Sequence, residues 1–147
     1  MYGDLVLKEV AKDYSTNSYK LIIACVDRNL VKLFFSDWEW INLGLVVSEQ
    51  LHKLPVEARS HSIVDIVRNE LSNISCDNIV VENIDLLFSP EYSLDVLKLF
   101  TLLGKTKRLI VIWDGTFKDG LVTYSEPGSK DYHKYEIKNF NAYCITK

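Results

Sequence analysis

The chain has 147 residues, of which 48% are hydrophobic and 25% are charged. That length suits one domain with a sizeable core, and the composition excludes a disordered tail. Seventeen basic against twenty acidic residues give a net charge of -3, which argues against broad non-specific binding to nucleic acid. We therefore expect a single domain over residues 1–147.

The three cysteines, Cys25, Cys76 and Cys144, form no CxxC pair and are odd in number. This usage is typical of buried thiols in a reducing compartment. The apolar runs are too short to cross a bilayer, and the first residues lack a charged secretion signal. We expect a cytoplasmic protein that does not contact a membrane.

Short apolar runs alternate with amphipathic segments through most of the chain. In chain order the patterns predict a helix in residues 4–13, a strand at 19–26, helices around 43–51 and 63–71, a strand from 78 to 81, a helix at 94–103 and a strand at 108–113. Strands separated by helices predict a parallel sheet, because each crossover carries the chain back over one face of the sheet.

The C-terminal part of the chain follows a different pattern. Residues 121–124, 135–137 and 141–146 read as strands with little helix between them. We expect these strands to be antiparallel additions at one edge of the sheet. The predicted fold class is α/β, with a mainly parallel sheet, flanking helices and antiparallel strands at the C-terminal edge.

A phosphate-binding loop is the first site to look for in such a fold. The pattern G-x-x-x-x-G-K-[ST] lets glycine N–H groups surround a phosphate after the first buried strand. No glycine lies between Val26 and Leu43, so Lys32 is not part of a glycine-rich phosphate-binding loop. Asp27 would also bring negative charge toward a phosphate. The sequence Gly104-Lys105-Thr106 follows a helix, which is the reverse of the required order, and indicates a helix end with a left-handed Gly104.

Acidic residues follow the second buried strand. Glu82, Asn83 and Asp85 come directly after the apolar residues 79–81. Carboxylates at the carboxyl ends of parallel strands lie where such sheets bind ligands. We name these three residues as candidate cofactor-binding residues. The competing interpretation is a turn or helix cap at Asn83 or Asp85.

Three further segments have a functional and a structural interpretation. The basic residues Lys105, Lys107 and Arg108, taken with Trp113, could bind nucleic acid, or they could be a solvated helix end. The pair Asp114-Gly115 indicates a turn. The aromatic residues 34–40 indicate packing at the core and its rim, with a binding surface as the alternative.

Four stretches, taken together in this order and spacing, resemble a known family: residues 42–55, 81–88, 110–115 and 121–132. The chain is similar to the small P-loop-containing BrxF proteins of type-III BREX phage-defence systems. The similarity covers most of the chain from Tyr19 onward. It implies a P-loop NTPase-like α/β core that acts with the other proteins of its defence operon.

The resemblance also implies where the family's motifs fall. The acidic strand-end motif falls on Glu82, Asn83 and Asp85, and the aromatic-Gly strand end falls on Trp113 and Gly115. The chain departs from the family between residues 26 and 40, which lack the glycines and the Lys-Thr pair of the phosphate-binding loop.

These features lead us to expect an accessory or regulatory subunit of an anti-phage defence complex, with a degenerate NTPase-like fold and no ATP hydrolysis. We expect no catalytic residue, metal or bound cofactor. One alternative is an active ATPase with a non-standard phosphate loop, in which Glu82 and Asp85 hold magnesium. Another is a nucleic-acid-binding module. Expected partners are the other proteins of the operon, with a homo-oligomer as a further option and nucleic acid contacted only indirectly.

Overall fold

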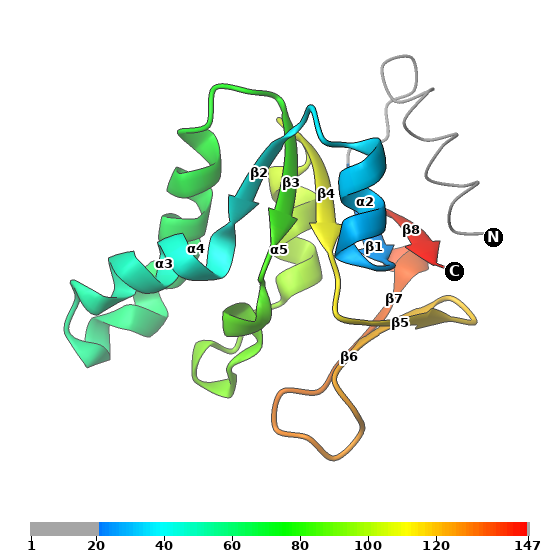
Figure 1. The fold of residues 1–147 in the computed structure, drawn as a ribbon. Helices are drawn as coiled ribbons and strands as arrows, with labels where there is room; N and C mark the ends of the chain where they lie inside the picture. Colours follow the sequence, from blue (N-terminus) through cyan, green and yellow to red (C-terminus); the bar gives the residue numbers. More distant parts are fainter. Residues whose placement is uncertain (1–20, 147) are drawn as a thin grey trace.

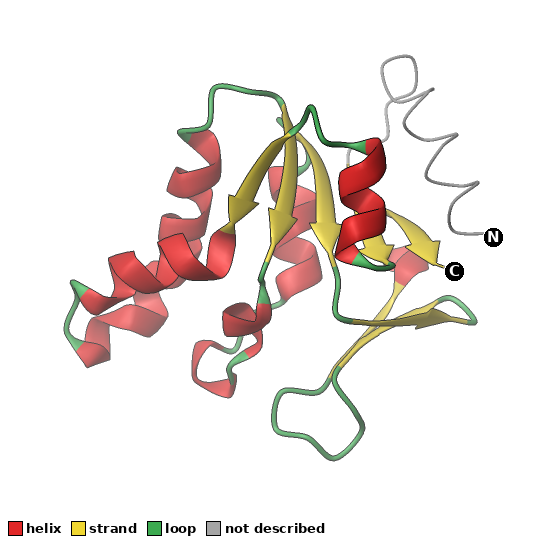
Figure 2. Cartoon of the chain, viewed as in Figure 1, coloured by secondary structure: helices red, strands yellow, loops and turns green. Residues whose placement is uncertain are grey.

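The computed structural model describes residues 21–146, which form an α/β fold with two sheets (Figures 1 and 2). The larger sheet has five strands in the order β2-β3-β4-β1-β8. These are β1 (Leu21–Cys25), β2 (Glu39–Asn42), β3 (Asn78–Glu82), β4 (Arg108–Ile112) and β8 (Tyr143–Thr146). Every pairing in this sheet is parallel. The predicted α/β fold with a mainly parallel sheet is therefore confirmed.

The helices cover the sheet on both faces. They are α2 (Arg28–Phe34), α3 (Leu43–His52), α4 (Val56–Ser72) and α5 (Val96–Leu103), with short 3-10 turns η1 (Asp85–Phe88), η2 (Pro90–Tyr92) and η3 (Ile137–Asn139). The step from β1 to β2 crosses the sheet in the opposite direction from the steps β2 to β3 and β3 to β4. Right-handed crossovers therefore place α2 on one face and α5 on the other, as Figure 1 shows.

Two apolar clusters lie on the two faces of the sheet. Alternate residues of the central strands enter each cluster, so that Ile23 and Val111 face α3, α4 and α5 while Ile22 and Ile110 face α2. The middle residues of β1, β3 and β4 are fully buried. Burial on both faces explains why these strands read as continuous apolar runs in the sequence. The predicted central strands and the three predicted helices in residues 43–103 are confirmed in their main extent.

Two elements at residues 28–42 are absent from the sequence prediction. The chain forms α2 and then β2 in a segment whose aromatic residues indicated packing at the core and its rim, with a binding surface as the alternative. Val31 and Phe35 anchor α2 in the core, and Trp40 packs against the same cluster from β2. Val31 is the one buried residue within α2, and none of the β2 residues is fully buried, so neither element shows a clear hydrophobic pattern.

The prediction for the C-terminal strands is wrong in two respects. β8 pairs in parallel with β1 as an edge strand of the main sheet. The antiparallel strands are β5 (Gly115–Lys118), β6 (Leu121–Tyr124) and β7 (His133–Glu136), and they form a separate sheet in the connection from β4 to β8. The connection from β4 to β8 therefore contains β-hairpins, where a parallel connection usually contains a helix.

Two local predictions are also corrected. Gly115 begins β5 instead of forming a turn, and a Cβ atom there would lie 1.9 Å from the Thr123 carbonyl oxygen. The β5–β6 pairing therefore needs glycine at this position. Gly104 ends α5 as predicted, but its φ is -69°, which is right-handed.

The structure also bears on the expected thiols and on membrane contact. Cys25, Cys76 and Cys144 are partly buried free thiols, and burial raises the pKa of Cys25 and of Cys144 to about 12. Within residues 21–146, no helix has the length and apolar character that a bilayer crossing requires. The helix predicted in residues 4–13 lies outside the described residues.

Candidate functional site

The carboxyl ends of the five parallel strands meet at one edge of the main sheet. From this edge the chain leaves β1 toward α2 on one face, and it leaves β3 toward η1 and α5 on the other face. Open parallel sheets commonly bind ligands outside the carboxyl ends of their strands. Glu82, Asn83 and Asp85 lie at this edge, where the sequence predicted a site.

The junction between β1 and α2 consists of two residues, Val26 and Asp27. The Asp27 carboxylate accepts a hydrogen bond from the Asn29 N–H at 2.7 Å and so caps α2. Asparagine and aspartate are among the preferred residues at this position because their side chains satisfy exposed helix N–H groups. The start of α2 therefore carries its own negative group, supplied from within the chain.

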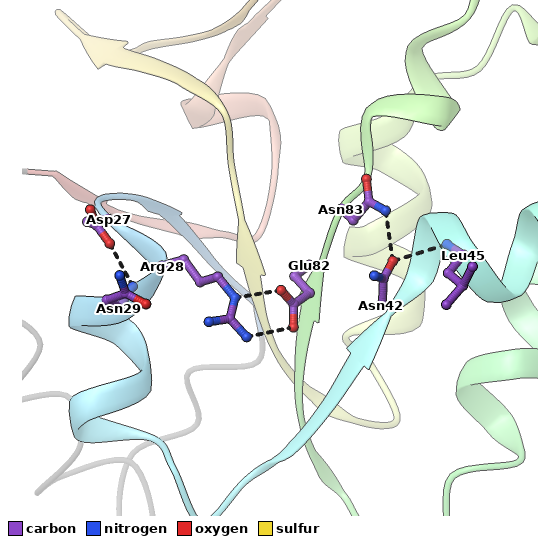
Figure 3. Close-up of polar contacts among 7 residues, drawn as sticks. All are labelled: Asp27, Arg28, Asn29, Asn42, Leu45, Glu82 and Asn83. Carbon is purple, nitrogen blue, oxygen red and sulfur yellow. Dashed lines mark hydrogen bonds and ion pairs between the residues drawn. The ribbon is translucent and has the colours of Figure 1, made fainter.

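Arg28, the first residue of α2, forms an ion pair with Glu82, the last residue of β3. Its Nε donates to Glu82 Oε1 at 2.6 Å, and its Nη2 donates to Oε2 at 3.3 Å (Figure 3). The Glu82 side chain is only 20% exposed, whereas that of Arg28 is 47% exposed. The hydrogen bond to Glu82 raises the pKa of Arg28 above its ordinary value. The planar guanidinium thus engages both carboxylate oxygens.

Trp40 of β2 extends this contact along α2. The Arg28 guanidinium carbon lies 5.1 Å from the centre of the Trp40 ring, and Lys32 Nζ lies 4.3 Å from it. The indole Nε1 donates to the carbonyl oxygen of Phe35, which caps the C-terminus of α2. Cation–π attraction and this hydrogen bond therefore attach α2 to β2 at both ends of the helix.

Asn83 connects the end of β3 to the start of α3. It adopts a left-handed conformation with φ of 59°, which asparagine tolerates better than most residues. Its Nδ2 donates to Asn42 Oδ1 at 2.8 Å (Figure 3). Its carbonyl oxygen accepts the Gly44 N–H. Asn42 Oδ1 also accepts the Leu45 N–H as the cap of α3. A Cβ atom on Gly44 would lie 2.6 Å from the Asn83 carbonyl oxygen, so this contact requires glycine.

Asp85 connects the same edge to the smaller sheet. The Tyr124 hydroxyl donates to Asp85 Oδ1 at 2.8 Å, and the Tyr124 ring stacks on Phe88 with centroids 3.7 Å apart. Tyr135 lies nearby, and its hydroxyl accepts the Val96 N–H at the start of α5. Burial raises the pKa of Tyr135 to about 12. Burial, with the hydrogen bond to Asp85 second, also raises the pKa of Tyr124.

The three predicted site residues share one edge but do not converge on one point. Glu82 binds Arg28, Asn83 binds Asn42, and Asp85 binds Tyr124. Across residues 21–146, no group of three or more His, Cys, Asp or Glu side chains is arranged to hold a metal ion. The three residues lie at or just after the end of β3, as the sequence pattern indicated. The pattern did not indicate their partners, which lie 39 to 54 positions away.

The basic cluster considered for nucleic acid is divided by the fold. Lys107 and Arg108 lie at the amino end of β4, whereas Trp113 follows its carboxyl end. Lys107 Nζ donates to the carbonyl oxygens of Ile74 at 2.6 Å and Cys76 at 3.1 Å, and its side chain is 15% exposed. Trp113 is buried, and its indole donates to the Thr123 carbonyl. Lys107 and Trp113 therefore have structural partners and do not form one surface.

A pocket of about 280 Å³ lies at one end of the smaller sheet. It is lined by the β5–β6 turn and the end of β7: Asp119, Gly120, Leu121, Glu136, Ile137 and Lys138. The Ile137 N–H donates to the Gly120 carbonyl across it. The lining brings together none of the predicted site residues.

Comparisons with protein-family models, with curated proteins and with solved structures give no match to this chain.

Replacing Tyr124 with phenylalanine tests the contact between the two sheets. The variant keeps the stack on Phe88 and loses the hydrogen bond to the exposed Asp85 carboxylate. We expect the free energy of unfolding in urea to fall by about 1 kcal/mol. In the Tyr124→Phe background, Asp85→Ala should cause no further fall in the free energy of unfolding. If the two losses add, the side chains act independently. Tyr92→Phe, at a partly buried tyrosine, is the matched control.

The raised pKa of the buried tyrosines predicts a loss of stability in alkali. Tyrosine ionises near pH 10 in the unfolded chain, whereas Tyr135 does so at about 12 in the folded protein. The neutral Tyr135 hydroxyl therefore contributes fully to the free energy of unfolding below about pH 10. This contribution is lost as the pH rises toward about 12, because the tyrosine ionises first in the unfolded chain. The urea midpoint should fall over this window, and Tyr135→Phe should weaken the fall. An unchanged midpoint would contradict the pKa shift.

Proposed function

We propose that this chain is a cytoplasmic accessory or regulatory subunit of an anti-phage defence complex, similar to the BrxF proteins, with an NTPase-like fold that does not hydrolyse ATP. The proposal rests on the resemblance of the four sequence stretches and on the chemistry of the carboxyl edge. Its partners would be the other proteins of the defence operon.

The architecture is compatible with an NTPase-like core. A parallel sheet has helices on both faces, and Glu82 ends the buried strand β3 at the edge where such sheets bind ligands, with Asp85 shortly after it. In P-loop proteins an acidic strand end of this kind holds magnesium beside the phosphates. Glu82 lies in the corresponding position in the family resemblance.

The residues at this edge do not fit magnesium-ATP. A phosphate-binding loop offers several backbone N–H groups to the phosphates, and those groups are usually supplied by glycines. Here the two-residue junction ends in Asp27, whose carboxylate accepts the Asn29 N–H that a phosphate would need. A phosphate would also meet repulsion from that carboxylate. The Asp27 cap at the start of α2 is the observation that carries the proposal.

The acidic residues have partners that compete with a metal. The Glu82 carboxylate receives two hydrogen bonds from Arg28, and Asp85 receives one from Tyr124. A magnesium ion would have to displace a guanidinium cation from Glu82. This arrangement supports a role in protein contact over a role in phosphoryl transfer, and no observation at this edge favours the active ATPase.

Calorimetric titration with ATP and magnesium tests the nucleotide part of the proposal. We expect no heat of binding in the micromolar range and no phosphate release above buffer. The reason is that Asp27 occupies the N–H at the start of α2 and Arg28 occupies the Glu82 carboxylate. Binding with turnover would refute the proposal, and loss of that turnover in Glu82→Ala and Asp85→Ala would establish the ATPase alternative.

Complex formation tests the biological part. We expect the full chain to co-purify with proteins encoded beside it when they are expressed together, without added nucleotide. A chain that remains alone under these conditions would contradict the accessory role.

A further inference from the structure

The Arg28–Glu82 ion pair joins two segments that are distant in sequence. Arg28 begins α2 and Glu82 ends β3, and 54 positions separate them. In the sheet, β4 lies between β1 and β3, so the two side chains meet across an intervening strand. Figure 3 shows Arg28 reaching from α2 to Glu82 on β3. The contact therefore connects the start of α2 to the end of β3 at the carboxyl edge of the main sheet.

The geometry of this pair differs from that of an ordinary surface salt bridge. Arg28 makes two hydrogen bonds to a carboxylate that is 20% exposed, and its guanidinium also lies over Trp40. The exposed pair of Arg68 and Asp65 on α4 makes one contact of 3.6 Å, with both side chains more than half exposed. Bidentate, partly buried pairs hold a fixed geometry, whereas single exposed pairs contribute little.

We propose that this ion pair is a permanent clasp that keeps α2 and the end of β3 in one arrangement whether or not nucleotide is present. This inference rests on the proposed function, since it explains how an NTPase-like edge holds together without a phosphate loop. In P-loop proteins the cations at this edge include a bound metal ion, so the arrangement changes with the ligand. Here the guanidinium supplies the positive charge from within the chain. A nucleotide could change this arrangement only by binding one conformation of the edge more tightly than another.

Hydrogen exchange of the full chain, with and without magnesium-ATP, tests the clasp. We compare the wild type with Glu82→Gln, which removes one charge at constant side-chain length, and with Arg28→Gln, which removes the guanidinium and its charge. We expect amide exchange in α2 and in residues 83–88 to rise on the order of fivefold in both variants. The double variant should exchange no faster than either single variant, because the same contact is lost. Magnesium-ATP should change none of these rates.

Two further variants serve as controls. Arg68→Gln removes the exposed guanidinium on α4 and should leave exchange in α2 at the wild-type rate. Arg28→Lys keeps the charge and loses the planar fork, so we expect an intermediate rise. This conservative variant decides the matter if the glutamine variants do not fold.

The outcomes separate the two proposals. If α2 exchanges at the wild-type rate in Arg28→Gln and Glu82→Gln, the clasp is overturned and the proposed function stands. If only Arg28→Lys folds, the same result in that variant has the same meaning. Protection of wild-type α2 by magnesium-ATP would overturn both, because it would show that nucleotide binds and changes this edge.

Discussion

The two hydrogen bonds between Arg28 and Glu82 set the arrangement of the carboxyl edge. A parallel sheet brings the polar ends of its strands together, and in many proteins a bound ligand satisfies them. In this protein the N-terminal residue of α2 supplies a cation to the acidic end of β3, and the Asp27 carboxylate accepts the Asn29 N–H of α2. Opposite charges that a ligand would neutralise are thus neutralised by neighbouring side chains.

The same edge is tied to the rest of the molecule by two further sets of contacts. Asn83 has a left-handed backbone conformation and forms hydrogen bonds with Asn42 and Gly44. These bonds fix the start of α3 against β3. Asp85 and Phe88 hold Tyr124, which fixes the smaller sheet beside the larger one. Each predicted site residue therefore contributes to the fold. At this edge Asp27 accepts the Asn29 N–H, and Glu82 and Asp85 accept hydrogen bonds from Arg28 and Tyr124.

The central strands could be predicted because burial on both faces makes them continuous apolar runs. α2 could not, since Val31 is the one buried residue among its seven, and β2 could not, since none of its four residues is fully buried. The parallel direction of β8 depends on its partner β1, which is distant in sequence and leaves no local signal. The positions of Glu82, Asn83 and Asp85 followed from their place after a buried strand. Their partners did not, because an arginine after the first strand and a tyrosine in a hairpin have no local pattern that marks them as partners.

The signal of the Arg28 side-chain Nε–H in a two-dimensional NMR spectrum tests the central claim most directly. With a bidentate partner, this proton should exchange slowly with water and give a resolved peak, which Glu82→Gln should displace. The peak and the backbone amides of Asn29 and Leu30 should keep their positions as magnesium-ATP is added. Movement of these three signals toward saturation would show that nucleotide enters the edge and that the ion pair gives way to it.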